Sequence, residues 1–208
     1  MKTSFLFLAF VVPLYILDQV TKWWCVLHFS ERKESGYVNE KGDAVYWWFN
    51  EAGNTKVDVI EGYFWLPRVH NQGVAWGMGN GSAWAPIVFL IVPIVALFVI
   101  RLLWIKGFFK LKPARYAAPL LLAGVLGNLT DRLVQGFYLE HLKGESFWTR
   151  LSEGYVVDFL AVKIPIIDYN FPVFNVADSC VSIAATLLLF TAVFEKKLAT
   201  MQGIKLDR

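Results

Sequence analysis

Two aspartates, Asp158 and Asp178, are the residues of this chain whose type and setting best fit a chemical step. Asp158 interrupts the run Tyr155-Val-Val-Asp-Phe-Leu160, where a strand pattern predicts apolar residues and Asp is rare. Two close carboxylates cannot both ionise easily, so they share a proton. One can then activate water while the other protonates a leaving nitrogen. The chemistry predicted for such a pair is hydrolysis of a peptide bond.

Each aspartate also has a purely structural interpretation. Asn175 is a good helix N-cap, and Asp178 three residues later would complete a capping box, where an acid also suits the helix dipole. Asp158 could be a strand residue that faces water. Taken singly, neither aspartate indicates catalysis, so the polar residues around them decide between the two interpretations.

Asp18 and Lys22 lie four residues apart near the end of an apolar run, so a helix would place both on one face. The acid and the base could simply neutralise each other there. Polar groups at membrane depth are costly, however, and by default they indicate a functional site. Both residues are therefore candidates for supporting such a site.

Asn128, Asp131 and Arg132 end another apolar run. Asn128 and Asp131 share one helix face, and Gly124 and Gly127 offer a surface on which a second helix can pack closely. Asn128 is expected to form hydrogen bonds to a neighbouring helix. Asp131 and Arg132 could pair with each other or hold the site together.

Other catalytic and metal-binding sets are absent from the sequence. It has no HExxH and no serine in a nucleophile-elbow context. Cys25 and Cys180 form no CxxC or Cys/His spacing and the three histidines are scattered, so no metal or cofactor is predicted. The net charge is only +3 without a long basic tract, so nucleic-acid binding is not expected.

The polar residues described above lie in or next to long apolar runs, which must form the elements that position them. The chain is 56% hydrophobic and only 18% charged, whereas a soluble domain carries about 25% charged residues. A membrane span needs about 20 apolar residues. The sequence predicts four spans in one membrane domain over residues 1–208, at residues 3–26, 82–105, 116–132 and 176–194. The first run could be a cleaved signal peptide, but Asp18-Gln-Val-Thr-Lys22 does not resemble a cleavage site, so a retained span is favoured.

The charges of the connecting segments predict the orientation of the spans. Residues 101–115 carry only basic charges, and the C-terminal tail is mostly basic. The positive-inside rule then places both termini and residues 101–115 in the cytoplasm. Residues 27–81 and 133–175 would lie outside, together with all the polar clusters described above.

The outer segments contain strand-like stretches. Residues 62–71 and 154–163 are rich in aromatic and β-branched residues, which favours strands, whereas residues 28–62 are interpreted as loop with a short helix. The predicted fold is an all-α bundle of four transmembrane helices with a small extracytoplasmic β-sheet. Such a sheet could cradle an extended peptide by strand addition.

Five motifs together resemble bacterial lipoprotein signal peptidase, also called signal peptidase II, which is a family of aspartic peptidases. They occur in the family's order between about residues 5 and 194. The motifs are Asp18-Gln-Val-Thr-Lys22, Asn71-Gln-Gly-Val-Ala-Trp76, Gly124-Val-Leu-Gly-Asn128-Leu-Thr-Asp131-Arg132, Val157-Asp158-Phe159 and Phe174-Asn175-Val-Ala-Asp178.

The resemblance implies an endopeptidase of the bacterial inner membrane that acts on diacylglyceryl-modified prolipoproteins. It would cut on the N-terminal side of the lipidated cysteine, contact membrane lipids, need no metal and bind globomycin-type inhibitors. The implied catalytic residues are Asp158 and Asp178. The implied surrounding and supporting residues are Asn71, Gly73, Asn128, Asp131, Arg132, Asn175, Asp18 and Lys22.

This chain departs from the family pattern at residues 28–62 and 133–153, which are longer than usual. Both segments lie outside the motifs, so they affect the expected shape of the peptide cradle rather than the chemistry.

Three alternatives to this function use the same features. A carboxylate-dependent proton- or ion-coupled transporter would also hold acids in a membrane, but transporters often show repeated halves, and no repeat occurs here. A lipid- or partner-binding membrane protein would explain the basic segment but not the converging acids. Other intramembrane aspartic proteases carry a Gly-x-Gly-Asp motif, which this sequence lacks.

Overall fold

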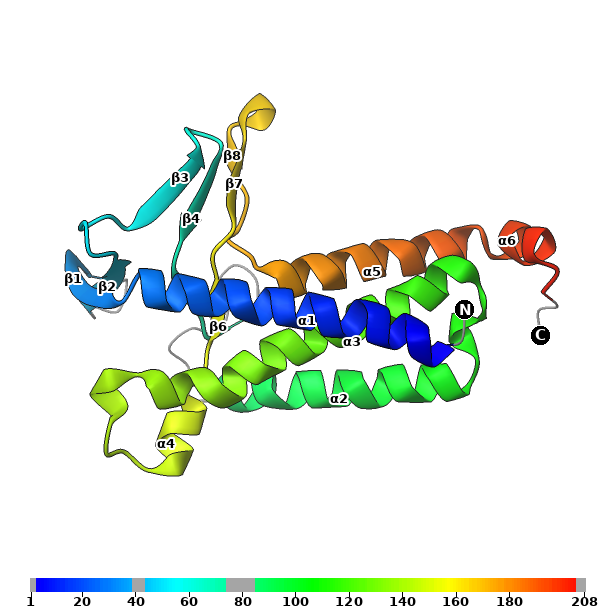
Figure 1. Cartoon of the computed structure of the whole chain (residues 1–208), viewed down its shortest axis with the longest axis horizontal. Helices are drawn as coiled ribbons and strands as arrows, with labels where there is room; N and C mark the ends of the chain where they lie inside the picture. The colour runs from blue at the N-terminus through cyan, green and yellow to red at the C-terminus, as the bar shows by residue number, and fades with distance from the viewer. Residues whose placement is uncertain (1–2, 39–43, 74–84, 205–208) are drawn as a thin grey trace.

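The computed structural model describes residues 3–38, 44–73 and 85–204. Within these ranges four helices are long and apolar enough to cross a membrane, as the sequence predicted. They are α1 (Thr3–His28), α2 (Ala85–Ile105), α3 (Lys112–Val134) and α5 (Val176–Val193). The four helices lie lengthwise beside one another, and both termini lie at one end of the bundle (Figure 1).

Helix α3 contacts α1, α2 and α5, and its small residues allow the close approach. A Cβ added at Gly124 would lie 2.5 Å from the backbone oxygen of Ala177 on α5. A Cβ added at Gly127 would lie 2.5 Å from Oδ2 of Asp18 on α1. The predicted packing surface on this helix is therefore confirmed.

Strands gather at the other end of the bundle, which we call the sheet end (Figure 1). An antiparallel sheet has the order β3-β4-β7-β8, and β5 pairs with β6 in a separate antiparallel ladder. The bounds are β3 (Lys56–Ile60), β4 (Phe64–Pro67), β5 (Val69–Asn71), β6 (Val156–Asp158), β7 (Ala161–Ile164) and β8 (Tyr169–Asn170).

The interpretation of residues 28–62 as loop with a short helix is wrong, because this segment contains β1 (Glu31–Val38), β2 (Ala44–Phe49) and β3. Charged residues disfavour strands, but here they pack on aromatic rings across the hairpin. The Arg32 guanidinium lies 4.0 Å from the ring centre of Tyr46, and the Lys33 ammonium lies 5.5 Å from that of Phe49. These cross-strand contacts outweigh the intrinsic preference.

Shorter elements complete the described chain. The segment after α3 contains η3 (Gln135–Tyr138), η4 (Glu140–Leu142) and α4 (Phe147–Ser152). The turn η2 (Phe108–Lys110) joins α2 to α3, and α6 (Glu195–Gln202) follows α5. Between β7 and β8 lies the turn η5 (Pro165–Ile167).

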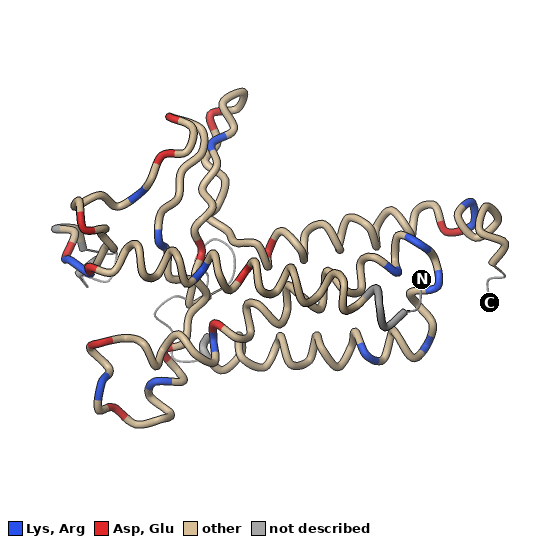
Figure 2. Tube along the Cα trace, viewed as in Figure 1, with Lys and Arg blue, Asp and Glu red and all other residues tan. Residues whose placement is uncertain are grey.

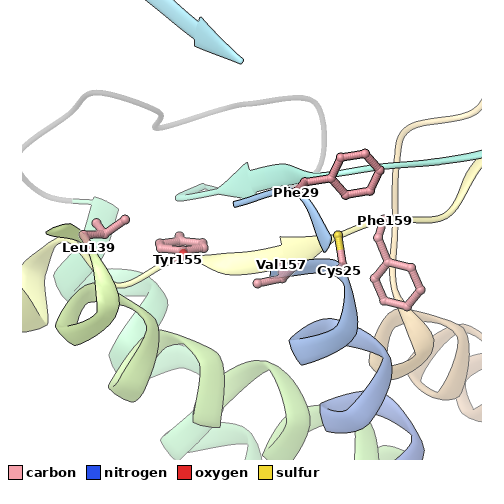
Figure 3. Close-up of a cluster of buried hydrophobic side chains, with 6 residues drawn as sticks. All are labelled: Cys25, Phe29, Leu139, Tyr155, Val157 and Phe159. Carbon is pink, nitrogen blue, oxygen red and sulfur yellow. The ribbon is translucent and has the colours of Figure 1, made fainter. Parts of the chain in front are cut away.

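A buried apolar cluster fixes β6 against the end of α1 (Figure 3). The cluster contains Cys25 of α1 and Phe29, the residue that follows α1. Against them pack Tyr155, Val157 and Phe159. Because successive strand residues point to opposite faces, the Asp158 side chain lies on the other face, away from this apolar core. The alternation of the strand thus turns Asp158 toward polar partners.

Candidate functional site

Asp158 ends β6, and Asp178 lies in the first turn of α5. Two amides connect the two carboxylates. The Asn175 Nδ2 donates to Asp158 Oδ1 over 2.8 Å and to Asn128 Oδ1 over 3.2 Å, while Asn128 Nδ2 donates to Asp178 Oδ1 over 2.8 Å. A continuous path of hydrogen bonds therefore runs from one aspartate to the other.

Asp158 is only 2% exposed, so its interpretation as a water-facing strand residue is wrong. Its partners explain why the strand can bury it. Asn71 on the neighbouring strand β5 donates from Nδ2 to Asp158 Oδ2 over 2.9 Å, and Asn175 occupies the other oxygen. Asn71 and Asp158 lie on the same face of the β5–β6 ladder, as diagonal neighbours.

The pKa of Asp158 is raised to about 7, first by burial and then by the negative charge of Asp178. The hydrogen bonds from Asn71 and Asn175 act in the opposite direction, because they stabilise the ionised form. A carboxyl group with this pKa holds a proton up to nearly neutral pH. Asp158 is therefore able to carry a proton close to the negative charge of Asp178.

The predicted capping box at the start of α5 is confirmed. Asn175 Oδ1 accepts from the backbone N–H of Asp178 over 2.9 Å, and Asp178 Oδ2 accepts from the backbone N–H of Asn175 over 3.2 Å. The cap uses Oδ2 of Asp178 and leaves Oδ1 to Asn128. Capping and a role in the site are thus compatible, because the cap fixes the direction of this carboxylate.

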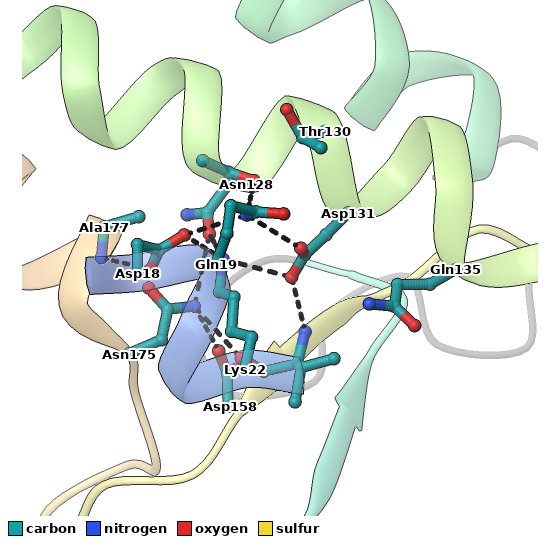
Figure 4. Close-up of polar contacts among 12 residues, drawn as sticks. Asp18, Gln19, Lys22, Asn128, Thr130, Asp131, Gln135, Asp158, Asn175 and Ala177 are labelled. Carbon is teal, nitrogen blue, oxygen red and sulfur yellow. Dashed lines mark hydrogen bonds and ion pairs between the residues drawn. The ribbon is translucent and has the colours of Figure 1, made fainter. Parts of the chain in front are cut away.

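Lys22 is fully buried between two aspartates (Figure 4). Its Nζ lies 2.9 Å from Asp18 Oδ2 and 3.0 Å from Asp131 Oδ2, and it donates to Asn128 Oδ1 over 2.9 Å. These contacts use all three donors of the ammonium group. The predicted Asp18–Lys22 contact is confirmed, although Lys22 also pairs with Asp131, and Asn128 bridges helices as expected.

The alternative in which Asp131 pairs with Arg132 is wrong, because Asp131 pairs with Lys22. Adjacent helix residues point about 100° apart, so the two side chains diverge. The Arg132 guanidinium instead lies within hydrogen-bond distance of two backbone oxygens, Gly73 O at 3.4 Å and Asn128 O at 3.5 Å. Arg132 therefore connects α3 to the segment that follows β5.

The buried acids around Lys22 also hold the backbone beside each site aspartate (Figure 4). Asp131 Oδ2 accepts from the backbone N–H of Val157 over 3.0 Å. Asp18 Oδ1 accepts from the backbone N–H of Ala177 over 2.8 Å. Val157 precedes Asp158, and Ala177 precedes Asp178, so the ion cluster fixes both strand and helix at the point where each carboxylate begins.

Gly73 lies at the edge of the site. Its backbone N–H donates to Asn71 Oδ1 over 3.1 Å, so the same asparagine orients both this turn and Asp158. The remaining motif residues, 74–76, lie outside the described residues, as do residues 82–84 of the predicted second span. The structure thus brings every predicted site residue to one region, around β6 and the start of α5.

The sequence placed Gln19 within the Asp18–Lys22 motif but gave it no role in the site. Its Nε2 is 3.2 Å from Asp18 Oδ2, from Asp131 Oδ1 and from Gly127 O. Its place beside two charged residues on a span was the available signal.

Arg68 was also missed, and no motif pointed to it. It is 8% exposed and donates to the backbone oxygens of Val26 and Phe29 and to the Tyr155 hydroxyl. His70, one of the three scattered histidines, stacks on Tyr155 with ring centres 3.6 Å apart. Burial, and then the charge of Arg68, lower the pKa of His70 well below its usual value. These residues brace β5 and β6 on the face opposite Asp158.

Comparisons with known proteins cover most of the chain. The family model described as Signal peptidase (SPase) II matches residues 10–194. The lipoprotein signal peptidase of Anoxybacillus flavithermus is 31% identical over 91% of this chain and 85% of that protein. That of Lactiplantibacillus plantarum is 28% identical over 88% of this chain and 91% of that protein. A solved structure described as "Bacterial membrane enzyme structure by the in meso method at 2.3 A resolution" has a TM-score of 0.62 and 25% identity, covering 97% of this chain and 93% of that one.

Proposed function

The chain belongs to the signal peptidase II family of aspartic peptidases, and from this we propose how it acts on its lipoprotein substrates. The family removes signal peptides from lipoproteins in the membrane. The proposal for this chain is that it hydrolyses diacylglyceryl-modified prolipoproteins on the N-terminal side of the lipidated cysteine. Asp158 and Asp178 would carry the reaction.

The observation that carries this mechanism is the hydrogen-bonded path between the two carboxylates, with the pKa of Asp158 raised to about 7. The ionised carboxylate accepts a proton from water while the water oxygen attacks the scissile carbonyl carbon. The protonated carboxyl then donates its proton to the leaving nitrogen as the C–N bond breaks. One proton enters the pair and one leaves it, so the pair ends with the same charge.

The charge distribution supports an extracytoplasmic site. Basic residues of the α2–α3 connection and of α6 lie at the end of the bundle that carries the termini (Figure 2). By the positive-inside rule that end would lie in the cytoplasm, and the sheet end and the aspartates would lie at the outer face of the inner membrane. The precursor, whose lipid anchors it in that leaflet, would then reach the site from the bilayer.

Several recognition features belong to the same proposal. Membrane lipids would surround the exposed apolar faces of the helices, and a precursor peptide would extend along the strands at the sheet end. A globomycin-type inhibitor, being a peptide mimic, would occupy that position.

A carboxylate-dependent transporter fits the structure less well. Transporters hold their coupling carboxylates near the middle of the bilayer. The acids of the described segments lie mainly towards the sheet end, and the central part of the bundle is largely free of them (Figure 2). The peptidase interpretation is therefore favoured.

Replacement of each aspartate tests the proposed pair. Asp158→Asn and Asp178→Asn should each lower the rate of cleavage of a lipidated prolipoprotein by at least about 100-fold, the usual contribution of a general acid or base. The measurement uses purified protein in lipid vesicles, with thermal unfolding to confirm that each variant is folded.

Asp58→Asn is the matched control, because Asp58 is a surface aspartate on β3 with its side chain 41% exposed. It should retain the parent rate. Full activity in a folded Asp158→Asn or Asp178→Asn protein would refute the proposed pair.

A further inference from the structure

The end of the β7–β8 hairpin exposes an unusual number of apolar side chains. Ile166 is 93% exposed and Ile167 is 66% exposed, while Ile164, Tyr169 and Phe171 are 36%, 42% and 47% exposed. We call residues 164–171 the hairpin foot. Exposed apolar side chains that lie this close together in the chain are typical of a surface that contacts a partner or a membrane.

The charges next to the foot do not oppose such a contact. Asp168 is the only charged residue within it, and its Oδ1 lies 2.6 Å from Lys163 Nζ at the base of the turn. The backbone N–H of Asp168 also bonds to the oxygen of Pro165 over 3.3 Å, which closes the turn. The pair leaves the foot without net charge and is itself exposed enough to remain in water or among lipid headgroups.

The position of the sheet determines where the foot lies relative to the helix bundle. The sheet stands out sideways from the helix bundle, and its strand order β3-β4-β7-β8 runs along the long axis of the molecule (Figure 1). Strand β8 is the edge nearest α5, whereas β3 is the edge nearest the β1–β2 hairpin. Along the long axis of the molecule, the foot therefore lies at about the same position as the start of the apolar helix α5, at Val176.

The two edges of the sheet differ in the charges they carry, although the end of β3 also exposes two apolar side chains. The β3 edge carries Lys56 and Asp58, whose side chains are 47% and 41% exposed and form an ion pair. The β8 edge carries the exposed Tyr169, and the exposed Phe171 follows the strand directly. Aromatic residues favour the boundary between lipid and water, and charged residues favour water. The aromatic edge therefore suits the lipid–water boundary better than the charged edge does.

Aromatic contacts join the foot to the start of α5. Tyr169 and Phe171 have ring centres 6.5 Å apart, and Phe171 meets Phe174 edge to face at 5.6 Å. Phe174 directly precedes Asn175, the N-cap that bonds to Asp158. A short series of contacts therefore connects the foot to the site.

We propose that the hairpin foot rests in the outer lipid–water interface, with Ile166 and Ile167 among the lipids and the Lys163–Asp168 pair at the headgroups. This inference rests on the orientation given under the proposed function. The edge strand β8 keeps the foot at interfacial depth, because unpaired backbone groups are too costly in hydrocarbon. The foot would set the height of the sheet above the bilayer, and hence the depth at which a lipidated peptide meets Asp158.

An environment-sensitive dye can measure the depth of the foot. Cys25 and Cys180 are buried, so a thiol-reactive NBD dye would label a cysteine introduced at Ile166 selectively. Ile166→Cys protein is labelled, reconstituted in phosphatidylglycerol–phosphatidylethanolamine vesicles and exposed to nitroxide-labelled lipid or to aqueous iodide. Glu51→Cys, on the exposed turn after β2, is the matched control.

We expect the dye at position 166 to emit at shorter wavelength than the dye at position 51 and to be quenched by nitroxide lipid. The dye at position 51 should be quenched by iodide. Equal iodide quenching at both positions would overturn the proposal, and so would protection of position 166 from both quenchers, which would indicate a protein partner such as a second copy.

Cleavage of lipidated precursor is measured on the same labelled proteins. A foot in lipid on a protein that does not cut the precursor would count against the proposed function alone. An active protein whose foot lies in water would count against the foot alone.

Discussion

Three asparagines control the two aspartates at the scale of single residues. Asn71 and Asn175 donate to Asp158, and Asn128 donates to Asp178. An amide donor stabilises an ionised carboxylate without adding charge. Burial and the neighbouring negative charge raise the pKa of Asp158, and the amides limit that rise. The pKa of Asp158 is thus set by opposing effects, and separate substitutions can change each of them.

Asn71→Ala should move the pH dependence of cleavage. Loss of the bond to Asp158 Oδ2 removes an interaction that favours the ionised form, so the pKa of Asp158 rises above about 7. The mechanism needs one protonated carboxyl, so kcat/KM of the parent should fall as pH rises through the apparent pKa of the pair. In the variant that fall should occur at higher pH, with a lower maximum.

The measurement is kcat/KM between pH 5 and 9 on a lipidated precursor, a range chosen at about two units on either side of this pKa. Asn54→Ala, at an exposed position in the β2–β3 turn, serves as the control and should leave the profile unchanged. A fall at the parent pH or at lower pH in Asn71→Ala would contradict the assignment of this hydrogen bond.

Lys22 acts at the scale of elements, because its partners come from α1 and α3 and those partners hold β6 and α5. A buried ion cluster contributes little net stability, but removal of one member leaves the others uncompensated. The cluster is therefore best understood as a device that fixes where several elements meet. Its stability cost and its positioning role can be separated by experiment.

Lys22→Met should destabilise the protein by about 3–5 kcal/mol, because Asp18 and Asp131 lose their buried counter-ion. Loss of order at Val157 and Ala177 should lower kcat more than it changes KM. Thermal unfolding in detergent and steady-state kinetics provide the two readouts.

The triple variant Asp18→Asn, Lys22→Met, Asp131→Asn removes all three charges while its amide oxygens can still accept from Val157 and Ala177. It should recover much of the lost stability and part of kcat. A triple variant no more stable than Lys22→Met would show that uncompensated charge is not the cause of the loss.

How far the sequence predicts each element depends on the range of the interactions that form it. Long apolar runs and the Asn175–Asp178 box are local patterns, and both are confirmed. The β1–β2 hairpin was missed because the stability of its charged strand comes from aromatic rings on the partner strand. The burial of Asp158 was missed for a similar reason, since its amide partners come from β5 and the α5 cap.

Side-chain pairing in the site shows the same limit. Spacing on one helix predicted the Asp18–Lys22 contact correctly. It did not predict that Asp131 pairs with Lys22 rather than with the adjacent Arg132, because this pairing depends on how α1 and α3 pack. Family resemblance named the residues that gather, whereas only the three-dimensional structure shows which atom of each one is used.

At the scale of the whole molecule, basic charge at one end and the carboxylate site towards the other give the bundle a polarity along its long axis (Figure 2). The positive-inside rule converts that polarity into an orientation. The foot, the sheet and the site would then all meet the outer leaflet, where a lipidated precursor presents its cysteine.

Thiol labelling at the two ends should reveal this orientation. Glu51 lies on an exposed turn at the sheet end, and Lys197 is an exposed residue of α6 near the termini. In spheroplasts, a membrane-impermeant maleimide should label Glu51→Cys directly and Lys197→Cys only after the membrane is permeabilised. The parent protein, whose two cysteines are buried, gives the background. Labelling in the reverse order would place the aspartates on the cytoplasmic side, where no exported precursor presents its lipidated cysteine, and the proposed reaction could not take place in that orientation.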